Sequence, residues 1–324
     1  MSNRSFCKVC AEAVPISRRS HGFAKRMDHG KAPEGCGTTA QNLHPLLRSK
    51  RIIKGYTPVP YNMPWMATLT RDKQSICSAI LLSKYDDDKS SLWAMVASHC
   101  IFKEADEQAL DEKEVDYTKF GLLFGVHDLR LTTPHVRYRT IQKVYRNFEP
   151  SDISLVKLNS PVKFDAYING LCFPDEPDER DVAEFYMCLT CGWGATKPPA
   201  PKTVATASNE LQCIEVKIEQ EKPSHVRRKS MLTIQWNDNS IQGPYKGDSG
   251  SPLFCRLFYD ARKFLYGIVT NGATFTSGGM TNFERIPSQA EWINEIMERK
   301  TVENLDRPEK QKCCFSLFYM CTLR

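Results

Sequence analysis

Short runs rich in β-branched, aromatic and other apolar residues recur from residue 51 onward, and turn residues separate them. A first set precedes residue 160, namely WMATLT, SAILLS, LWAMVAS, FGLLFGVHDL, VRYRTIQKVY and ISLVKL. A second set follows residue 184, namely FYMCLTCGW, LQCIEVKI, SMLTIQW, PLFCRLF, FLYGIVTNG and GMTNFERI. Many short strands at this spacing are typical of a sandwich or barrel. The pattern therefore predicts an all-β chain, and its two sets predict two barrels.

The two ends of the chain differ from this β-rich middle. Residues 1–51 are polar and basic with scattered Gly and Pro, which is typical of a poorly ordered leader. One helix is expected after Pro287, where SQAEWINEIMERK places Trp292 and Ile296 on one face. Residues 300–324 are charged and then cysteine-rich, so we interpret them as a tail. The folded domain is thus expected to span residues 52–299.

The chain has 13 cysteines among 324 residues, which favours an oxidising compartment. Zinc is the competing interpretation, because Cys7 and Cys10 have the spacing of a zinc finger. No second CxxC or HxxxH follows at a workable distance, so we expect no metal and no other cofactor.

Charge and hydropathy exclude two classes of partner. The net charge of +6 is mild for this length, and no basic stripe interleaves with aromatic residues, so we expect no nucleic-acid partner. No apolar run is long enough to span a membrane. The N-terminal residues MSNRSFCKVCAEAV lack the apolar core of a signal peptide. Either this start is incomplete or alternative, or export is unconventional, and the cysteines still favour a secreted protein.

A glycine-flanked serine is the first candidate for chemistry. In Gly247-Asp248-Ser249-Gly250 the glycines permit a tight turn that exposes the serine hydroxyl. The N–H groups of Gly247 and Ser249 could then bind a developing oxyanion. Taken alone, GDSG is a weak signal, and an ordinary surface turn explains it equally well.

A nucleophilic serine needs a base and a carboxylate that orients the base. His99 ends an apolar run in Ala-Ser-His-Cys, and Asp152 begins another in Ser-Asp-Ile-Ser-Leu. The chain order His99, Asp152, Ser249 is the order of the chymotrypsin type of triad.

From Arg51 to Arg299 the chain resembles the trypsin/chymotrypsin-like serine proteases. The motifs that carry the resemblance are RIIKG, PWMATL, ASHC, DISLVKL, CGWG, GDSGSP, GIVTNG and EWINEIM. The resemblance implies two perpendicular antiparallel six-stranded β-barrels with a C-terminal α-helix. It also implies a serine endopeptidase made as a zymogen, in which cleavage after Arg51 frees Ile52 to pair with Asp248. Its partners would be a protein or peptide substrate, an activating protease and protein protease inhibitors.

The resemblance also implies three disulfide bridges, the last of which would keep the leader attached after cleavage. The implied pairs are Cys77–Cys100, Cys188–Cys255 and Cys36–Cys172. The unassigned cysteines are Cys7, Cys10, Cys191, Cys213, Cys313, Cys314 and Cys321. Seven is an odd number, so at least one thiol is free or joins another chain.

The primary specificity pocket departs from the family pattern. Gly243 stands where trypsins carry an aspartate, and Pro244 follows it. Thr270 and Gly272 enclose an asparagine where the family usually has Ser-Trp-Gly. These changes argue against a trypsin-like preference for basic side chains. The loop that binds calcium in trypsins has Val126 in place of a glutamate, so no calcium site is expected.

Two functions from different classes remain after these arguments. The first is an active endopeptidase that uses His99, Asp152 and Ser249. The second is a catalytically weak or inactive homologue that binds or regulates other proteins, and the altered pocket favours it. Retention of all three triad residues and both glycines of the turn favours the first.

Overall fold

The computed structural model describes most of the region from residue 55 to residue 303. The described residues are 35–39, 55–83, 89–103, 110–147, 151–173, 185–196, 206–218, 231–235, 243–258, 260–271 and 280–303. The predictions for Arg51, Ile52 and Gly272, and for the cysteines near both ends of the chain, lie outside them.

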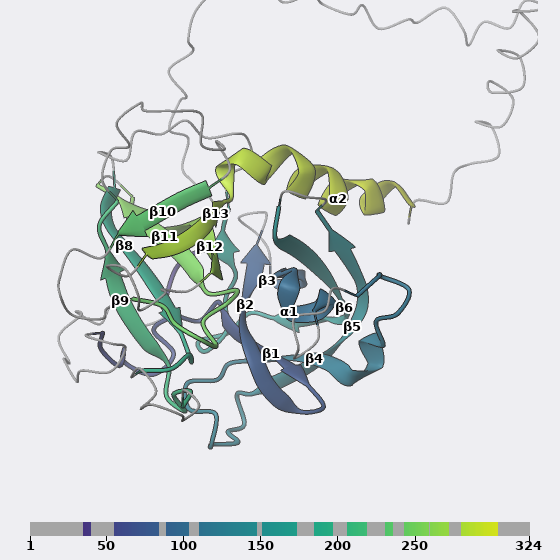
Figure 1. Ribbon diagram of the computed structural model, residues 1–324, viewed down its shortest axis with the longest axis horizontal. Helices are drawn as coiled ribbons and strands as arrows, with labels where there is room; N and C mark the ends of the chain where they lie inside the picture. Colours follow the sequence, from purple (N-terminus) through teal and green to yellow (C-terminus); the bar gives the residue numbers. More distant parts are fainter. Residues whose placement is uncertain are drawn as a thin grey trace, which may run out of the picture. The chain divides into compact units, whose positions relative to one another are not determined.

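The first set of strands forms a closed barrel (Figure 1). Its order is β1-β4-β5-β6-β3-β2, and β2 pairs back with β1, with every pairing antiparallel. Three of these ladders contain register shifts, which help a sheet to bend and close. The strands are β1 (Met66–Arg71), β2 (Gln74–Ser83), β3 (Ser90–Ala97), β4 (Phe120–Phe124), β5 (Arg137–Arg146) and β6 (Ile153–Lys163).

A second set of six antiparallel strands follows the order β9-β8-β11-β12-β13-β10. The strands are β8 (Phe185–Gly192), β9 (Gln212–Val216), β10 (Met231–Gln235), β11 (Pro252–Leu257), β12 (Lys263–Asn271) and β13 (Met280–Arg285). The short strand β7 (Leu171–Cys172) pairs in parallel with both β2 and β12 and so links the two sets. The predicted all-β, chymotrypsin-like fold is confirmed.

Helices are few, as expected from the sequence. The described helical elements are α1 (His99–Phe102), η1 (Tyr117–Lys119), η3 (Pro287–Gln289) and α2 (Ala290–Glu303). The prediction of a helix after Pro287 is confirmed, with Pro287 at its expected place in the first turn. None of the helices described is long and apolar enough to cross a membrane.

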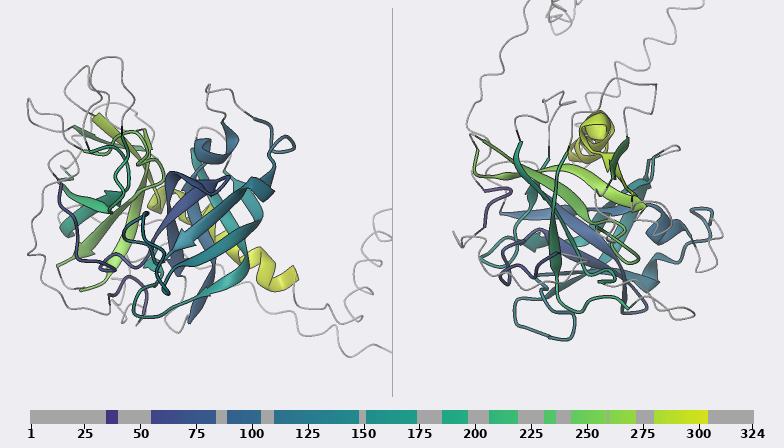
Figure 2. Two further views of the ribbon diagram at one scale, coloured as in Figure 1. Left: turned by 90° about the horizontal axis from the view of Figure 1, so that it is seen from below. Right: turned by 60° about the vertical axis from the view of Figure 1, so that its left-hand side comes forward.

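The buried apolar residues form three clusters that follow from this arrangement. One fills the first barrel, and another lies within the second set around Val269 and Phe283. The third joins residues of both sets, including Trp65, Ile153 and Phe254, and it also takes in Ile293 of α2. Figure 2 shows the two strand sets side by side. The third cluster takes its residues from both of them.

A short segment before the first barrel is fixed to the body of the protein. Cys36 is disulfide-bonded to Cys172, and Gly37 donates its N–H to the carbonyl of Gly170 at 2.7 Å. The carbonyl of Gly37 accepts from the N–H of Lys263 at 3.1 Å. A Cβ at Gly37 would lie 2.2 Å from the Lys263 carbonyl oxygen, so this close approach requires glycine.

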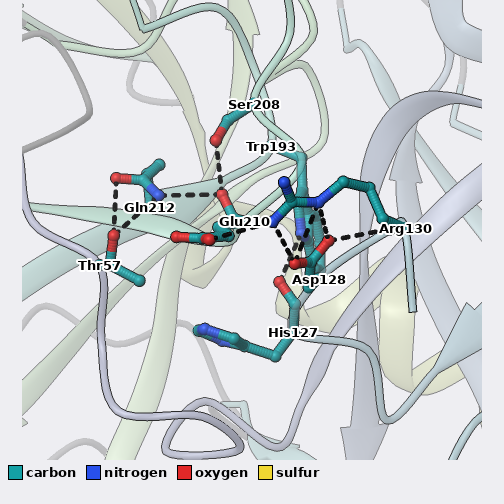
Figure 3. Close-up of polar contacts among 8 residues, drawn as sticks. All are labelled: Thr57, His127, Asp128, Arg130, Trp193, Ser208, Glu210 and Gln212. Atoms are coloured by element: carbon teal, nitrogen blue, oxygen red, sulfur yellow. Dashed lines mark hydrogen bonds and ion pairs between the residues drawn. The ribbon is translucent and has the colours of Figure 1, made fainter. Parts of the chain in front are cut away.

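A polar network ties the loop after β4 to the segment before β9 (Figure 3). Arg130 contacts Asp128 through two nitrogens and reaches Glu210 at 3.1 Å. The carbonyl of His127 accepts from the indole N–H of Trp193 at 3.2 Å. The Arg130 side chain is exposed to solvent, so its ion pairs contribute little to stability. Their main effect is to fix where the two segments meet.

A fourth disulfide joins Cys191 to Cys213, which face each other across the β8–β9 ladder. The sequence left both cysteines unassigned. Because this bridge closes 22 residues, replacing both cysteines by alanine should lower the free energy of unfolding by about 3 kcal/mol. Chemical denaturation under non-reducing conditions would measure this loss.

Removal of Cys188–Cys255 is the matched comparison, because it spans 67 residues in the same strand set. Its longer loop should make that loss larger by about 1 kcal/mol. Equal stability of the wild type and the Cys191→Ala/Cys213→Ala variant would contradict the structural role of the fourth bridge.

Candidate active site

The antiparallel pairing of β3 with β6 brings His99 and Asp152 together. Ala97 is opposite Ile153 in this ladder, so the residues just beyond these strand ends lie side by side. The carbonyl of Asp152 accepts the N–H of Ser98 at 2.9 Å. Two motifs far apart in the sequence thus become neighbours through strand register alone.

Two contacts hold the His99 side chain against Asp152. One Asp152 carboxylate oxygen accepts the backbone N–H of His99 at 2.9 Å, and the other lies 2.7 Å from His99 Nδ1. Because an ionised carboxylate only accepts hydrogen bonds, Nδ1 carries the proton. This tautomer leaves the lone pair of Nε2 available to act as a base.

The disulfide Cys77–Cys100 anchors the short helix that begins with His99. The three donor atoms of Cys77, His99 and Cys100 lie within 4.8 Å of one another. Both sulfurs are already bonded to each other, so they offer no thiolate to a metal ion.

Ser249 is in a tight turn between the two strand sets. Gly247 and Gly250 flank it with φ of 95° and 80°, a conformation that favours glycine. The carbonyl of Ser249 accepts the N–H of Ser78 at 2.9 Å, and Gly250 donates to the carbonyl of Val269 at 2.8 Å. Because Ser78 follows Cys77, the turn is attached beside the disulfide that anchors His99.

The structure thus brings the three candidate residues to one region. Among them, a hydrogen bond joins His99 to Asp152. Ser249 is half-buried, and its hydroxyl makes no hydrogen bond within the described part of the chain. The same holds, over these residues, for the backbone N–H groups of Gly247 and Ser249. Hydrogen bonds of this kind often form only once a substrate is present.

Asp248 is buried beneath this turn, with 3% of its surface exposed. Its carboxylate accepts the backbone N–H of Gly194 at 2.8 Å and that of Tyr245 at 2.9 Å. A Cβ on Gly194 would lie 2.3 Å from the Asp248 carboxyl, which explains the glycine of CGWG. Burial raises the pKa of Asp248 to about 6, against the lowering effect of the two N–H groups.

The residues expected at the specificity pocket are only partly described. Gly243 and Pro244 are buried, and Gly243 has a φ of 104°, where a side chain would strain the backbone. Thr270 is also buried, and its hydroxyl donates to the carbonyl of Asn282 at 3.3 Å. The positive φ of Gly243 is therefore a second reason why this position carries no carboxylate side chain.

One charged residue near the site was not expected from the sequence. Glu284 lies on β13 with 1% of its surface exposed, close to the backbone of Asp152. Burial raises its pKa to about 7, and the negative charge of Asp152 also raises it. In the sequence it is followed by Arg285 in FERI, and a charged residue in a strand normally indicates a solvent-facing position.

Comparison with known proteins agrees with this arrangement. The family model described as Trypsin matches residues 52–293, about three quarters of the chain. Granzyme M of Rattus norvegicus is 26% identical over 212 residues, which cover 63% of this chain and 74% of that protein.

Asp248 should give the intact chain a distinctive dependence of stability on pH. Its pKa of about 6 in the folded state exceeds the ordinary 3.8, so folding favours its protonated form. The stabilisation is full below pH 4 and is lost as the pH rises to about 6, by up to roughly 3 kcal/mol. Asp248→Asn should remove this component from denaturation curves measured between pH 4 and pH 6.5.

Asp72→Asn is the control, because Asp72 is an exposed turn residue with a φ of 50° that asparagine tolerates. That variant should keep the pH dependence of the wild type. An unchanged slope in Asp248→Asn would refute the burial cost assigned to Asp248.

Proposed function

Because the chain belongs to the trypsin family, we propose that it is a serine-type endopeptidase made as a zymogen. The observation that carries the proposal is the 2.7 Å contact between His99 Nδ1 and Asp152, beside the glycine-flanked turn of Ser249. A merely structural histidine would not need a carboxylate that fixes its tautomer next to a glycine-flanked serine turn. The proposed protease domain spans residues 52–299.

In the proposed reaction, His99 Nε2 takes the proton of the Ser249 hydroxyl as its oxygen attacks the peptide carbonyl carbon. The N–H groups of Gly247 and Ser249 then stabilise the oxyanion. His99 gives the proton to the leaving amine, and an acyl-enzyme on Ser249 remains. Water, deprotonated by His99, hydrolyses this ester and restores the hydroxyl.

Activation is proposed to follow cleavage after Arg51, and buried Asp248 supports this step. Its carboxylate has two backbone donors, and none of the cationic side chains that the structure describes pairs with it. The new ammonium of Ile52 would supply the missing charge, and pairing would offset the cost of burying each group alone. Asp248 adjoins Ser249, so this pairing would order the oxyanion site.

The leader is proposed to stay attached after this cleavage. Cys36 is covalently bonded to Cys172, and the backbone of Gly37 is hydrogen-bonded on both sides. Residues 1–51 would then act as a tethered pro-segment, and residues 300–324 as a tail. Four disulfides within the described residues also favour a secreted protein.

A covalent probe tests the proposed chemistry. Protein cleaved after Arg51, with the new N-terminus verified by sequencing, should react stoichiometrically with a fluorophosphonate at Ser249. Uncleaved protein should react far more slowly, and Asp152→Asn should slow the reaction about 10³- to 10⁴-fold because the tautomer of His99 is no longer fixed. Intact-mass spectrometry would measure the labelled fraction.

Ser249→Ala is the matched control and should not be labelled. Labelling that persists in this variant would place the nucleophile elsewhere. Absence of labelling after verified cleavage would favour the alternative, a binding or regulatory homologue without turnover.

The pocket is proposed to accept a neutral or apolar side chain. Gly243 and Pro244 provide no carboxylate for a basic side chain, and the φ of Gly243 disfavours one there. A peptide library digested with the activated protein should show no preference for Arg or Lys before the cut. Trypsin on the same library gives the reference pattern, and a matching pattern would overturn this assignment.

A further inference from the structure

The buried carboxyl of Glu284 lies near the backbone of Asp152, the residue proposed to orient the catalytic base. Glu284 is on β13, opposite Met231 of β10 and Ile268 of β12. Asp152 precedes β6 in the first barrel. The two residues thus come from different strand sets, and the backbone N–H and the charge of Asp152 both act on the pKa of Glu284.

Two neutral side chains anchor Glu284 in this position. The amide nitrogen of Gln289 donates to Glu284 Oε1 at 3.0 Å. The amide oxygen of Gln289 accepts in turn from the side chain of Asn147 at 2.8 Å. The backbone N–H of Asn147 donates to the carbonyl of Ile153 at 3.0 Å, which ties this chain of contacts to β6.

On its other side, Glu284 contacts the segment that carries Asp152. The backbone N–H of Asp152 and the hydroxyl of Ser151 lie close enough to lower the pKa of Glu284. The Ser151 hydroxyl is buried and has no hydrogen bond of good geometry elsewhere, so Glu284 is its available polar neighbour. The carbonyl of Asp152 is already held by Ser98.

We propose that Glu284 is a positioning residue for the candidate triad. Anchored by Gln289, its carboxyl supports the backbone at Asp152 and so fixes the Asp152 carboxylate against His99. This inference rests on the proposed function, because it assigns Glu284 a part in the same acyl transfer. It makes the second strand set responsible for aligning a pair that belongs wholly to the first barrel.

The charge of Glu284 gives this role a measurable signature. Among the described residues, Asp152 is the one charged group that acts on the pKa of Glu284, while Met231, Ile268 and Gln289 are neutral neighbours. With its pKa raised to about 7 by burial, Glu284 gains a negative charge near neutral pH. An ionised carboxyl accepts the backbone N–H of Asp152 more strongly than a neutral one. The labelling rate should therefore contain a component that rises near pH 7 with Glu284 and is absent without its charge.

The test measures rate constants of fluorophosphonate labelling between pH 5 and pH 9 on the full chain cleaved after Arg51. Glu284→Gln keeps the size of the side chain and removes its charge. It should label about 10-fold more slowly at pH 8 because Asp152 is less well fixed. Its labelling profile should lack the component near pH 7 that the ionisation of Glu284 gives the wild type.

Gln289→Met provides a second variant at a half-buried position, in case the first does not fold. Loss of the Gln289 donor raises the pKa of Glu284 and keeps it neutral to higher pH. The component near pH 7 should therefore move to a higher pH. Glu215→Gln, at an exposed position on β9, is the matched control and should change neither rate nor profile.

If Glu284→Gln has the same labelling rate and the same pH profile as the wild type, the proposal is wrong. A slower rate with an unmoved profile would also overturn it, because a purely structural role predicts that result. If Glu284→Gln does not fold, an unmoved profile in Gln289→Met decides against it. If the wild type is not labelled after verified cleavage, the proposed function itself is wrong. If the wild type is labelled and both variants have its rate and profile, the proposed function stands and the role of Glu284 is wrong.

Discussion

The apolar layer between the two strand sets is the interaction on which the rest of the structure depends. It packs Trp65 and Ile153 from the first barrel against Phe254 from the second set, with the rings of Trp65 and Phe254 in an edge contact at 5.1 Å. The candidate nucleophile belongs to the second set and the candidate base to the first. No covalent bond within the described site joins them directly, so this packing determines their relative position.

The same layer encloses polar groups that cost stability. Asp248 and Glu284 are both buried, and burial raises the pKa of each toward neutrality. Selection for stability alone would favour apolar residues at these two buried positions. Their position directly beneath Ser249 and behind Asp152 is consistent with retention for function, because strained or costly groups concentrate at functional sites.

Much of the fold could be predicted from the sequence because its signals are local. Strand runs, turn residues and the helix after Pro287 depend on neighbours along the chain, and the structure confirms them. Other features depend on pairing between distant segments. The disulfide between Cys191 and Cys213 requires that β8 and β9 be adjacent and in one register, which no local pattern specifies. Glu284 was missed because strand alternation alone does not show that both faces of β13 are covered.

The sequence by itself determined the family of this chain, its fold class and the identity of the residues that could form a triad. The order of His99, Asp152 and Ser249, with glycines around the serine, carries that information in short motifs. Only the tertiary structure decided that Ala97 pairs with Ile153, which places His99 Nδ1 at 2.7 Å from Asp152. It alone placed Glu284 behind that pair. The reason is physical: motifs specify chemical groups, whereas distances and burial arise from long-range packing between two sets of strands.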